Sequence, residues 1–232
     1  MIYFLENFNF LLKQNQLSLE KISDKTKISV DEIEKIKKGL IEPNLLQLLT
    51  ISEVLNYPTD RILKENISKT QQLLENFNFK MLMLDVDGVL TDGGMYYTQN
   101  CDEYKKFDTK DGMAIKKLTN AAYNVGFVSS GINETIIRKR AELLGVQMIY
   151  VGTWDKLGVV EKWSKELEIG LENMAYIGDD VNDFAIMQKV GLSACPADSV
   201  GKIKEIAKII LSKKGGEGCV REFVDNYLMK IE

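Results

Sequence analysis

The chain has 232 residues, of which 34 are Asp or Glu and 30 are Lys or Arg, so its formal net charge is −4. It contains no histidine. Imidazole is the commonest general base near neutral pH and the commonest metal ligand. Its absence therefore excludes Ser-His-Asp and Cys-His catalysis, HExxH zinc hydrolysis and histidine-ligated haem. An enzyme of this composition is expected to work with carboxylates, lysines and hydroxyls, with or without a hard metal ion.

The cysteines and the apolar segments indicate where such a chain works. Cys101, Cys195 and Cys219 lie far apart and form no CxxC pair, so neither a zinc knuckle nor a disulfide framework is predicted. The N-terminus lacks a basic leader and a small-residue cleavage site. No apolar run approaches the roughly 18 residues of a membrane span. We expect a soluble, cytoplasmic protein without a membrane partner.

Two regions of different pattern follow one another along the chain. Residues 1–68 are rich in Leu, Ile, Lys, Glu and Gln, without strand-like alternation, and predict a small helical domain. Residues 69–79 are predicted to be a linker. From residue 80 to 232, short apolar runs alternate with amphipathic segments. The runs that predict strands are 81–86, 125–130, 148–152, 174–180 and 191–196. Helices are expected near 111–123, 133–144, 156–169, 181–189 and 199–209.

This alternation predicts an α/β domain, a Rossmann-like parallel sheet with helices on both faces. Residues 93–110 interrupt the alternation. Two aromatic-rich runs there flank the polar segment QNCDE, a pattern typical of a β-hairpin that projects beyond the sheet.

The string LDVDGVLTDGG, residues 84–94, carries the strongest chemical signal. A buried strand ends at Asp85, Asp87 follows, and Gly88 permits a tight turn. Alternation sends both carboxylates to the same side, at the edge where open parallel sheets bind ligands. A capped turn would explain one Asp and the Gly, but not two carboxylates at the end of an apolar strand. Such a pair repels unless a cation or a proton lies between the two charges.

A second strand, in AYIGDDVND at 175–183, runs into three further carboxylates, Asp179, Asp180 and Asp183. One of the three is accounted for as a helix cap. If both strands end at the same edge, Asp179 approaches the first pair. Oxygen ligands of this kind suit Mg²⁺, which also binds substrate phosphate.

Two weaker signals complete a site for phosphoryl transfer. The string VSSG ends a third strand with Ser130 and Gly131, and a hydroxyl with free N–H groups at such a turn binds anions. Lys156 begins a helix after another strand and supplies a point charge for phosphate. Each feature alone is typical of a solvated surface. Their order along successive strand ends is the informative part.

These strings resemble the haloacid dehalogenase superfamily of aspartyl phosphotransferases, and more closely its capless branch of sugar-acid phosphatases. The resemblance extends over residues 80–232. It rests on the strings DVDGVLTDGGMYY, EYKKFDTKDGMAI, VSSG, DKLGVVEKW, YIGDDVNDFAIMQKVGLS and GGEGCVREFV. It implies that Asp85 is the nucleophile that forms an aspartyl-phosphate. Asp87 is implied to protonate the leaving sugar oxygen and then to activate water.

The resemblance also implies the binding residues. Mg²⁺ would be held by Asp85, the backbone carbonyl of Asp87 and Asp179. Asp180 and Asp183 would support the metal site and orient Lys156. Ser130 and Lys156 would hold the transferred phosphoryl group. The expected substrate contacts are Gly88, Gly131, Arg140 and Arg221.

Capless enzymes of this kind form tetramers in which a neighbouring subunit covers the site, and the 93–110 hairpin suits such an interface. The substrate stays open between two sugar-acid phosphates, and the strings GGMYY and EYKKF resemble the nonulosonate branch more closely. Ile132 and Leu143 stand where the nonulosonate 9-phosphate branch has Glu and Lys, and Ile132 also replaces an Arg typical of the octulosonate branch. The commoner activity, on 3-deoxy-D-manno-octulosonate 8-phosphate, is favoured.

Residues 12–63 resemble a lambda-repressor-like helix-turn-helix, which implies DNA as a partner and a regulator as the competing function. A helical bundle without a DNA role is the alternative. Residues 1–70 carry 10 basic and 10 acidic side chains, so the region is neutral. The expected recognition helix begins with Asp31 and Glu32, which repel phosphates, whereas basic side chains dominate DNA affinity.

Overall fold

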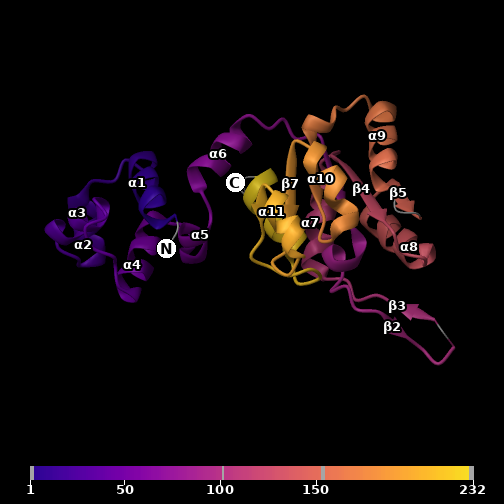
Figure 1. Cartoon of the computed structure of the whole chain (residues 1–232), viewed down its shortest axis with the longest axis horizontal. Coiled ribbons are helices and arrows are strands. Elements are labelled where there is room, and N and C mark those ends of the chain that lie inside the picture. The colour runs from indigo at the N-terminus through magenta and orange to yellow at the C-terminus, as the bar shows by residue number, and fades with distance from the viewer. Residues whose placement is uncertain (1–2, 101, 153–154, 230–232) are drawn as a thin grey trace. The chain divides into compact units, whose positions relative to one another are not determined.

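The computed structural model describes residues 3–100, 102–152 and 155–229 (Figure 1). The chain forms two compact units, a helical unit (1–76) and an α/β unit (77–232). The last helix of the first unit, α6 (Ile67–Glu75), occupies most of the segment expected to link the two. The Asn66 side chain caps it by accepting a hydrogen bond from the Lys69 N–H at 3.0 Å.

The helical unit encloses a core of its own. Its other helices are α1 (Phe4–Gln14), α2 (Leu19–Thr26), α3 (Val30–Lys37), α4 (Leu45–Leu55) and α5 (Thr59–Lys64). Fully buried side chains such as Phe8, Ile33 and Ile51 form the core. Ser18 and Ser29 cap α2 and α3. These caps satisfy N–H groups that a helix leaves without partners at its start.

The α/β unit is built on a six-stranded parallel sheet, which confirms the predicted fold class. The strand order is β5-β4-β1-β6-β7-β8. The strands are β1 (Met81–Leu84), β4 (Asn124–Ser129), β5 (Met148–Val151), β6 (Met174–Ile177), β7 (Leu192–Cys195) and β8 (Ile209–Ile210). Both faces of the central strands are buried, which is why they read as continuous apolar runs.

Helices cover the sheet on both faces. Met81 and Met83 of β1 pack with α9 (Lys156–Leu167), α10 (Phe184–Lys189) and α11 (Gly201–Ile206). Alternation along β1 sends Leu82 and Leu84 to the opposite face. There α7 (Thr109–Asn120) packs against β4 and against its neighbours α8 (Glu134–Leu144) and α12 (Cys219–Phe223), and α8 packs against β5. The two described cysteines, Cys195 and Cys219, are buried and free.

The hairpin expected in residues 93–110 is present and extends away from the sheet (Figure 1). Strands β2 (Tyr96–Tyr97) and β3 (Glu103–Tyr104) pair in antiparallel register. A bridge between Thr91 and Phe107 closes its base. Cys101 lies outside the described residues. Among the helices that are described, none is long and apolar enough to cross a bilayer.

Candidate active site

Three strands bring their carboxyl ends to one place on the sheet. Leu84, the last residue of β1, is in register with Phe127 of β4 and with Ile177, the last residue of β6. Asp85 follows Leu84 directly, and its Oδ1 accepts a hydrogen bond from the Val86 N–H at 2.6 Å. Because all three strands are parallel, the residues after β4 and β6 meet Asp85 at this edge.

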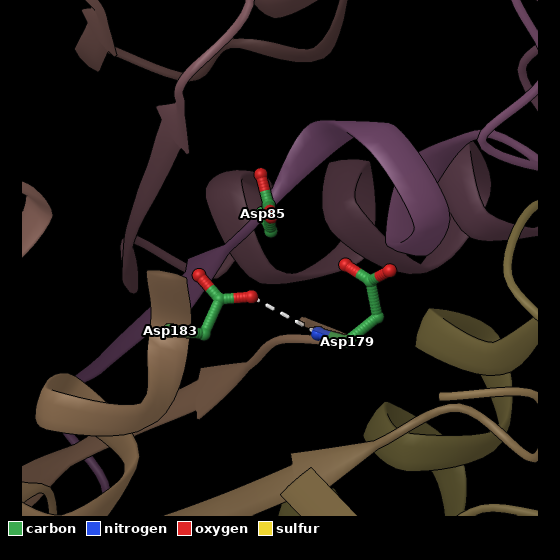
Figure 2. Close-up of side chains that lie close together, drawn as sticks. All are labelled: Asp85, Asp179 and Asp183. Atoms are coloured by element: carbon green, nitrogen blue, oxygen red, sulfur yellow. Dashed lines mark hydrogen bonds between the residues drawn. The ribbon is translucent and has the colours of Figure 1, made fainter. Parts of the chain in front are cut away.

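The carboxylates of Asp85, Asp179 and Asp183 form one cluster. Each offers an oxygen, and these oxygens lie within 4.8 Å of one another. Figure 2 shows the three side chains together at the strand ends, with the hydrogen bond from the Asp179 N–H to Asp183 dashed. The other oxygen of Asp183, Oδ1, accepts from the Tyr176 hydroxyl at 2.6 Å and from Lys156 at 2.8 Å. Asp183 is thus held by protein donors on both oxygens, which suits a supporting role.

Lys156 is the cation of this cluster. Its side chain has no exposed surface, and its Nζ lies 2.7 Å from Asp85 Oδ2 and 2.8 Å from Asp183 Oδ1. Burial by itself lowers the pKa of the ammonium, but the charges of Asp85 and Asp183 outweigh it and raise that pKa. Lys156 therefore stays protonated between two carboxylates.

One ammonium does not balance three carboxylates. Burial, followed by the charge of Asp183, raises the pKa of Asp85 well above its ordinary value despite Lys156. The same two causes raise the pKa of Asp179 to about 7. Asp179 Oδ1 is buried and meets no hydrogen-bond donor among the described residues. A buried acceptor without a donor, beside excess negative charge, fits a divalent cation with oxygen ligands.

The turn after β1 is shaped around this cluster. Gly88 has a φ of +87°, a conformation that favours glycine. A Cβ at Gly88 would overlap the Asp179 carboxylate, so this glycine lets the two strand ends approach. On the other side of the turn, Gly215 packs against the Gly88 carbonyl, and the Gly216 N–H donates to Val89 O at 3.0 Å. The C-terminal segment thus supports the turn.

The end of β4 lies beside Asp87. The Gly131 N–H donates to Ser129 Oγ at 3.0 Å, and a Cβ on Gly131 would lie 3.3 Å from Asp87 Oδ2. Ser130 Oγ accepts from the Asn182 side chain at 3.3 Å, which ties this turn to the one after β6. The structure therefore brings Asp87, Ser130 and Gly131 to the edge that holds the carboxylate cluster.

Three of the expected site residues make their contacts elsewhere. Arg140 donates to Asp108 O at 3.1 Å, and its guanidinium lies over the Phe107 ring. Arg221 donates its N–H to Asp111 at 2.8 Å and pairs its side chain with Asp225. Asp180 is exposed and accepts from the Val181 N–H, which makes it the cap of the turn. Substrate contacts by the two arginines stay predictions.

The comparisons with known proteins agree with this geometry. A sequence model of the haloacid dehalogenase-like hydrolases matches residues 16–223. The chain belongs to this family.

Known phosphatases match about two thirds of the chain. The chain is 36% identical over 152 residues to the 3-deoxy-D-manno-octulosonate 8-phosphate phosphatase of Escherichia coli, covering 66% of this chain and 80% of that protein. It is 37% identical over 158 residues to the Haemophilus influenzae phosphatase of the same name, covering 68% and 86%. The Moraxella catarrhalis phosphatase, solved with a magnesium ion, a phosphate ion and KDO, superposes with a TM-score of 0.63 at 29% identity, covering 68% of this chain and 88% of that one.

Sequence reasoning missed three residues that this hydrolase places around the site. Tyr176 bonds Asp183, and Asn182 bonds Ser130. Lys105 Nζ lies 2.6 Å from Asp87 Oδ1. A tyrosine near the end of a buried strand was a visible signal for Tyr176, since its hydroxyl needs a partner there. Nothing local distinguishes Lys105 from its neighbour Lys106.

Proposed function

We propose that this hydrolase is a Mg²⁺-dependent phosphatase that acts on a sugar-acid phosphate, 3-deoxy-D-manno-octulosonate 8-phosphate. The observation that carries the proposal is the placement of Asp85, Lys156 and Asp179 at one edge of the sheet. The named activity of the E. coli and H. influenzae relatives supports the choice of substrate.

The proposed reaction uses the two carboxylates of the first motif. An Asp85 oxygen attacks phosphorus while the bond from phosphorus to the sugar oxygen breaks, and Asp87 donates its proton to that oxygen. Asp87, now a carboxylate, takes a proton from water as the water attacks the aspartyl-phosphate. Inorganic phosphate leaves and the Asp85 carboxylate is restored. Lys156 and Ser130 orient the phosphoryl group in both steps.

The cation would be held by Asp85 and Asp179, together with the backbone carbonyl of Asp87. When bound, Mg²⁺ neutralises negative charge on the transferred phosphoryl group. Support comes from the raised pKa of Asp179 and from its buried Oδ1, which lacks a donor among the described residues. The donor set of carboxylate and carbonyl oxygens matches the preference of magnesium. The two other carboxylates would support it, Asp183 by orienting Lys156 and Asp180 by capping the turn.

The alternative substrate class, nonulosonate 9-phosphates, has weaker support. The two positions that would carry Glu and Lys in that branch hold Ile132 and Leu143, whose side chains are 97% and 59% exposed. Both side chains are aliphatic, so neither has a group that could hydrogen-bond a sugar hydroxyl. The octulosonate assignment therefore rests on the relatives rather than on these two positions.

A phosphate-release screen tests the function. We expect the purified chain with Mg²⁺ to release phosphate faster from octulosonate 8-phosphate than from a nonulosonate 9-phosphate, and to lose activity when EDTA removes the metal. A reversed preference would establish the alternative substrate. Release from neither sugar phosphate nor from an aryl phosphate would refute the proposal.

We propose a homotetramer in which the hairpin forms part of the interface. The hairpin exposes large apolar side chains, with Met95 at 70%, Tyr97 at 58% and Tyr104 at 60%. Several large, exposed apolar and aromatic side chains on one short hairpin are typical of a surface that a partner covers. Sedimentation equilibrium that found only a monomer would contradict it. Location in the cytoplasm stays a prediction.

DNA binding by the helical unit is the second candidate function. The observation in its favour is that α2 and α3, of eight residues each, are joined by a short turn. Against it, Lys35 and Lys38 on and after α3 are paired with Asp31 and Glu34 at 2.6 and 2.7 Å. We expect fluorescence anisotropy at low salt to find no sequence-selective binding to DNA duplexes taken from the region upstream of the coding sequence. Selective, salt-dependent binding would show that the chain is also a regulator.

A further inference from the structure

Lys105 is a buried cation that the reaction above does not use. It follows β3 of the hairpin, and its side chain is only 4% exposed. Its Nζ lies 2.6 Å from Asp87 Oδ1 and 2.9 Å from Glu103 Oε1. Lys106, the next residue, is 64% exposed and reaches Asp92 only at 3.6 Å. The hairpin thus directs one of two adjacent lysines onto the proposed acid.

The contacts of Asp87 differ between its two oxygens. Oδ1 accepts from Lys105 and lies 3.4 Å from Thr91 Oγ1. Oδ2 faces the turn after β4, where a Cβ on Gly131 would lie 3.3 Å away. Within the described part of the chain, no donor bonds Oδ2. One oxygen is held by the protein, and the other is left facing the turn that carries Ser130.

A buried ammonium is costly unless it is paired, so Lys105 is bound to its two carboxylates. Charge-assisted hydrogen bonds of this length are about twice as strong as neutral ones. Glu103 fixes Lys105 from the hairpin side, and Lys105 then fixes Asp87. Without Lys105, Asp87 keeps only the long contact from Thr91 and is free to rotate away from the turn.

We propose that Lys105 is a positioning residue, which holds Asp87 Oδ1 so that Oδ2 delivers the proton to the leaving oxygen. This inference rests on the proposed phosphatase function, because it assigns Lys105 to the proton-transfer step of that reaction. Lys105 itself neither attacks phosphorus nor carries the proton. Its effect is on the orientation of the acid, a requirement for efficient transfer.

The test compares two leaving groups in one variant. A sugar alkoxide must be protonated as it leaves, whereas the phenolate of p-nitrophenyl phosphate leaves without a proton. The value of kcat/KM reports the reaction up to leaving-group release. For Lys105→Met we expect kcat/KM on octulosonate 8-phosphate to fall by about 10²-fold, the usual contribution of general acid catalysis. On the aryl phosphate we expect less than about a threefold loss, because phosphoryl transfer to Asp85 does not require the acid.

Three further variants sharpen the result. Lys106→Met is the matched control and should leave both substrates unaffected. Lys105→Arg keeps the charge and should restore part of the sugar-phosphate rate. Glu103→Gln leaves Lys105 in place with a weaker anchor. For this variant kcat/KM should again fall on the sugar phosphate and not on the aryl phosphate, by a smaller factor than for Lys105→Met. It provides the test if Lys105→Met does not fold.

Equal losses on the two substrates would overturn the proposal and make Lys105 a phosphate-binding or purely structural residue. A change in KM alone would overturn it in favour of a sugar contact. These outcomes require an active wild-type protein and leave the proposed function standing. A wild-type protein that is inactive on both substrates refutes the proposed function and this inference together.

Discussion

Replacing Asp85 by Asn is expected to lower kcat for phosphate release by about 10⁴-fold or more, as removal of a catalytic nucleophile does. The amide oxygen is a poor nucleophile, so no phosphoryl intermediate forms. The fold should persist, because Asp183 still pairs with Lys156 at 2.8 Å after the substitution. Steady-state phosphate release measures the rate, and far-UV circular dichroism with thermal unfolding reports the fold.

A second Asp→Asn change provides the control. Asp24 is exposed on α2 of the helical unit, and Asp24→Asn should retain full activity. If the Asp85 variant kept more than a tenth of the wild-type kcat, the nucleophile would have to be another residue. A fluoride complex that binds in place of the phosphoryl group would then identify the carboxylate that carries it.

Replacing Lys156 by Met is expected to destabilise the metal-free protein by about 3–5 kcal/mol, the usual consequence of removing one partner from a buried ion pair. Lys156 is fully buried against Asp85 and Asp183. Its loss leaves three clustered carboxylates without an ammonium. Urea unfolding in EDTA gives the free energy of unfolding. Added Mg²⁺ should restore part of the loss, because a ligand that binds the folded state stabilises it.

The surface ion pair of Lys189 provides the matched control. Lys189 Nζ lies 2.7 Å from Glu161, at about the same distance as in the buried pair, but its side chain is 50% exposed. Solvent screens this pair, so Lys189→Met should cost less than about 1 kcal/mol. Equal losses in the two variants would mean that the carboxylate cluster is already neutralised without Lys156.

The elements of the α/β unit were largely predictable, because their signals are local. Apolar runs placed β1, β4, β5, β6 and β7 within a few residues. Strand β8, at Ile209–Ile210, was missed because two residues are too short for a periodic signal. The segment around α6 falls largely in the expected linker, and it is a polar helix that the Asn66 cap begins. Polarity alone does not distinguish a linker from a solvated helix.

Within the site, local reasoning found the carboxylates but not their partners. Asp85 and Asp179 were expected to approach because each follows a buried strand. Only the family resemblance pointed from Asp183 to Lys156, because the bonds that Lys156 and Tyr176 donate to Asp183 join three elements that meet in space. In the structure Arg140 lies over the Phe107 ring and donates to Asp108 O, and its expected contact with substrate stays a prediction.

By itself, the sequence determined which chemistry this chain can use. With no histidine, carboxylates, lysines and hydroxyls were left as the candidate catalytic groups, and turn-forming glycines after apolar strands located them. Only the tertiary structure decided how they combine. The strand order sets β1 between β4 and β6, and the hairpin register buries Lys105 while Lys106 stays exposed. Both depend on packing between residues far apart in the chain, whereas periodicity and turn chemistry act between neighbours.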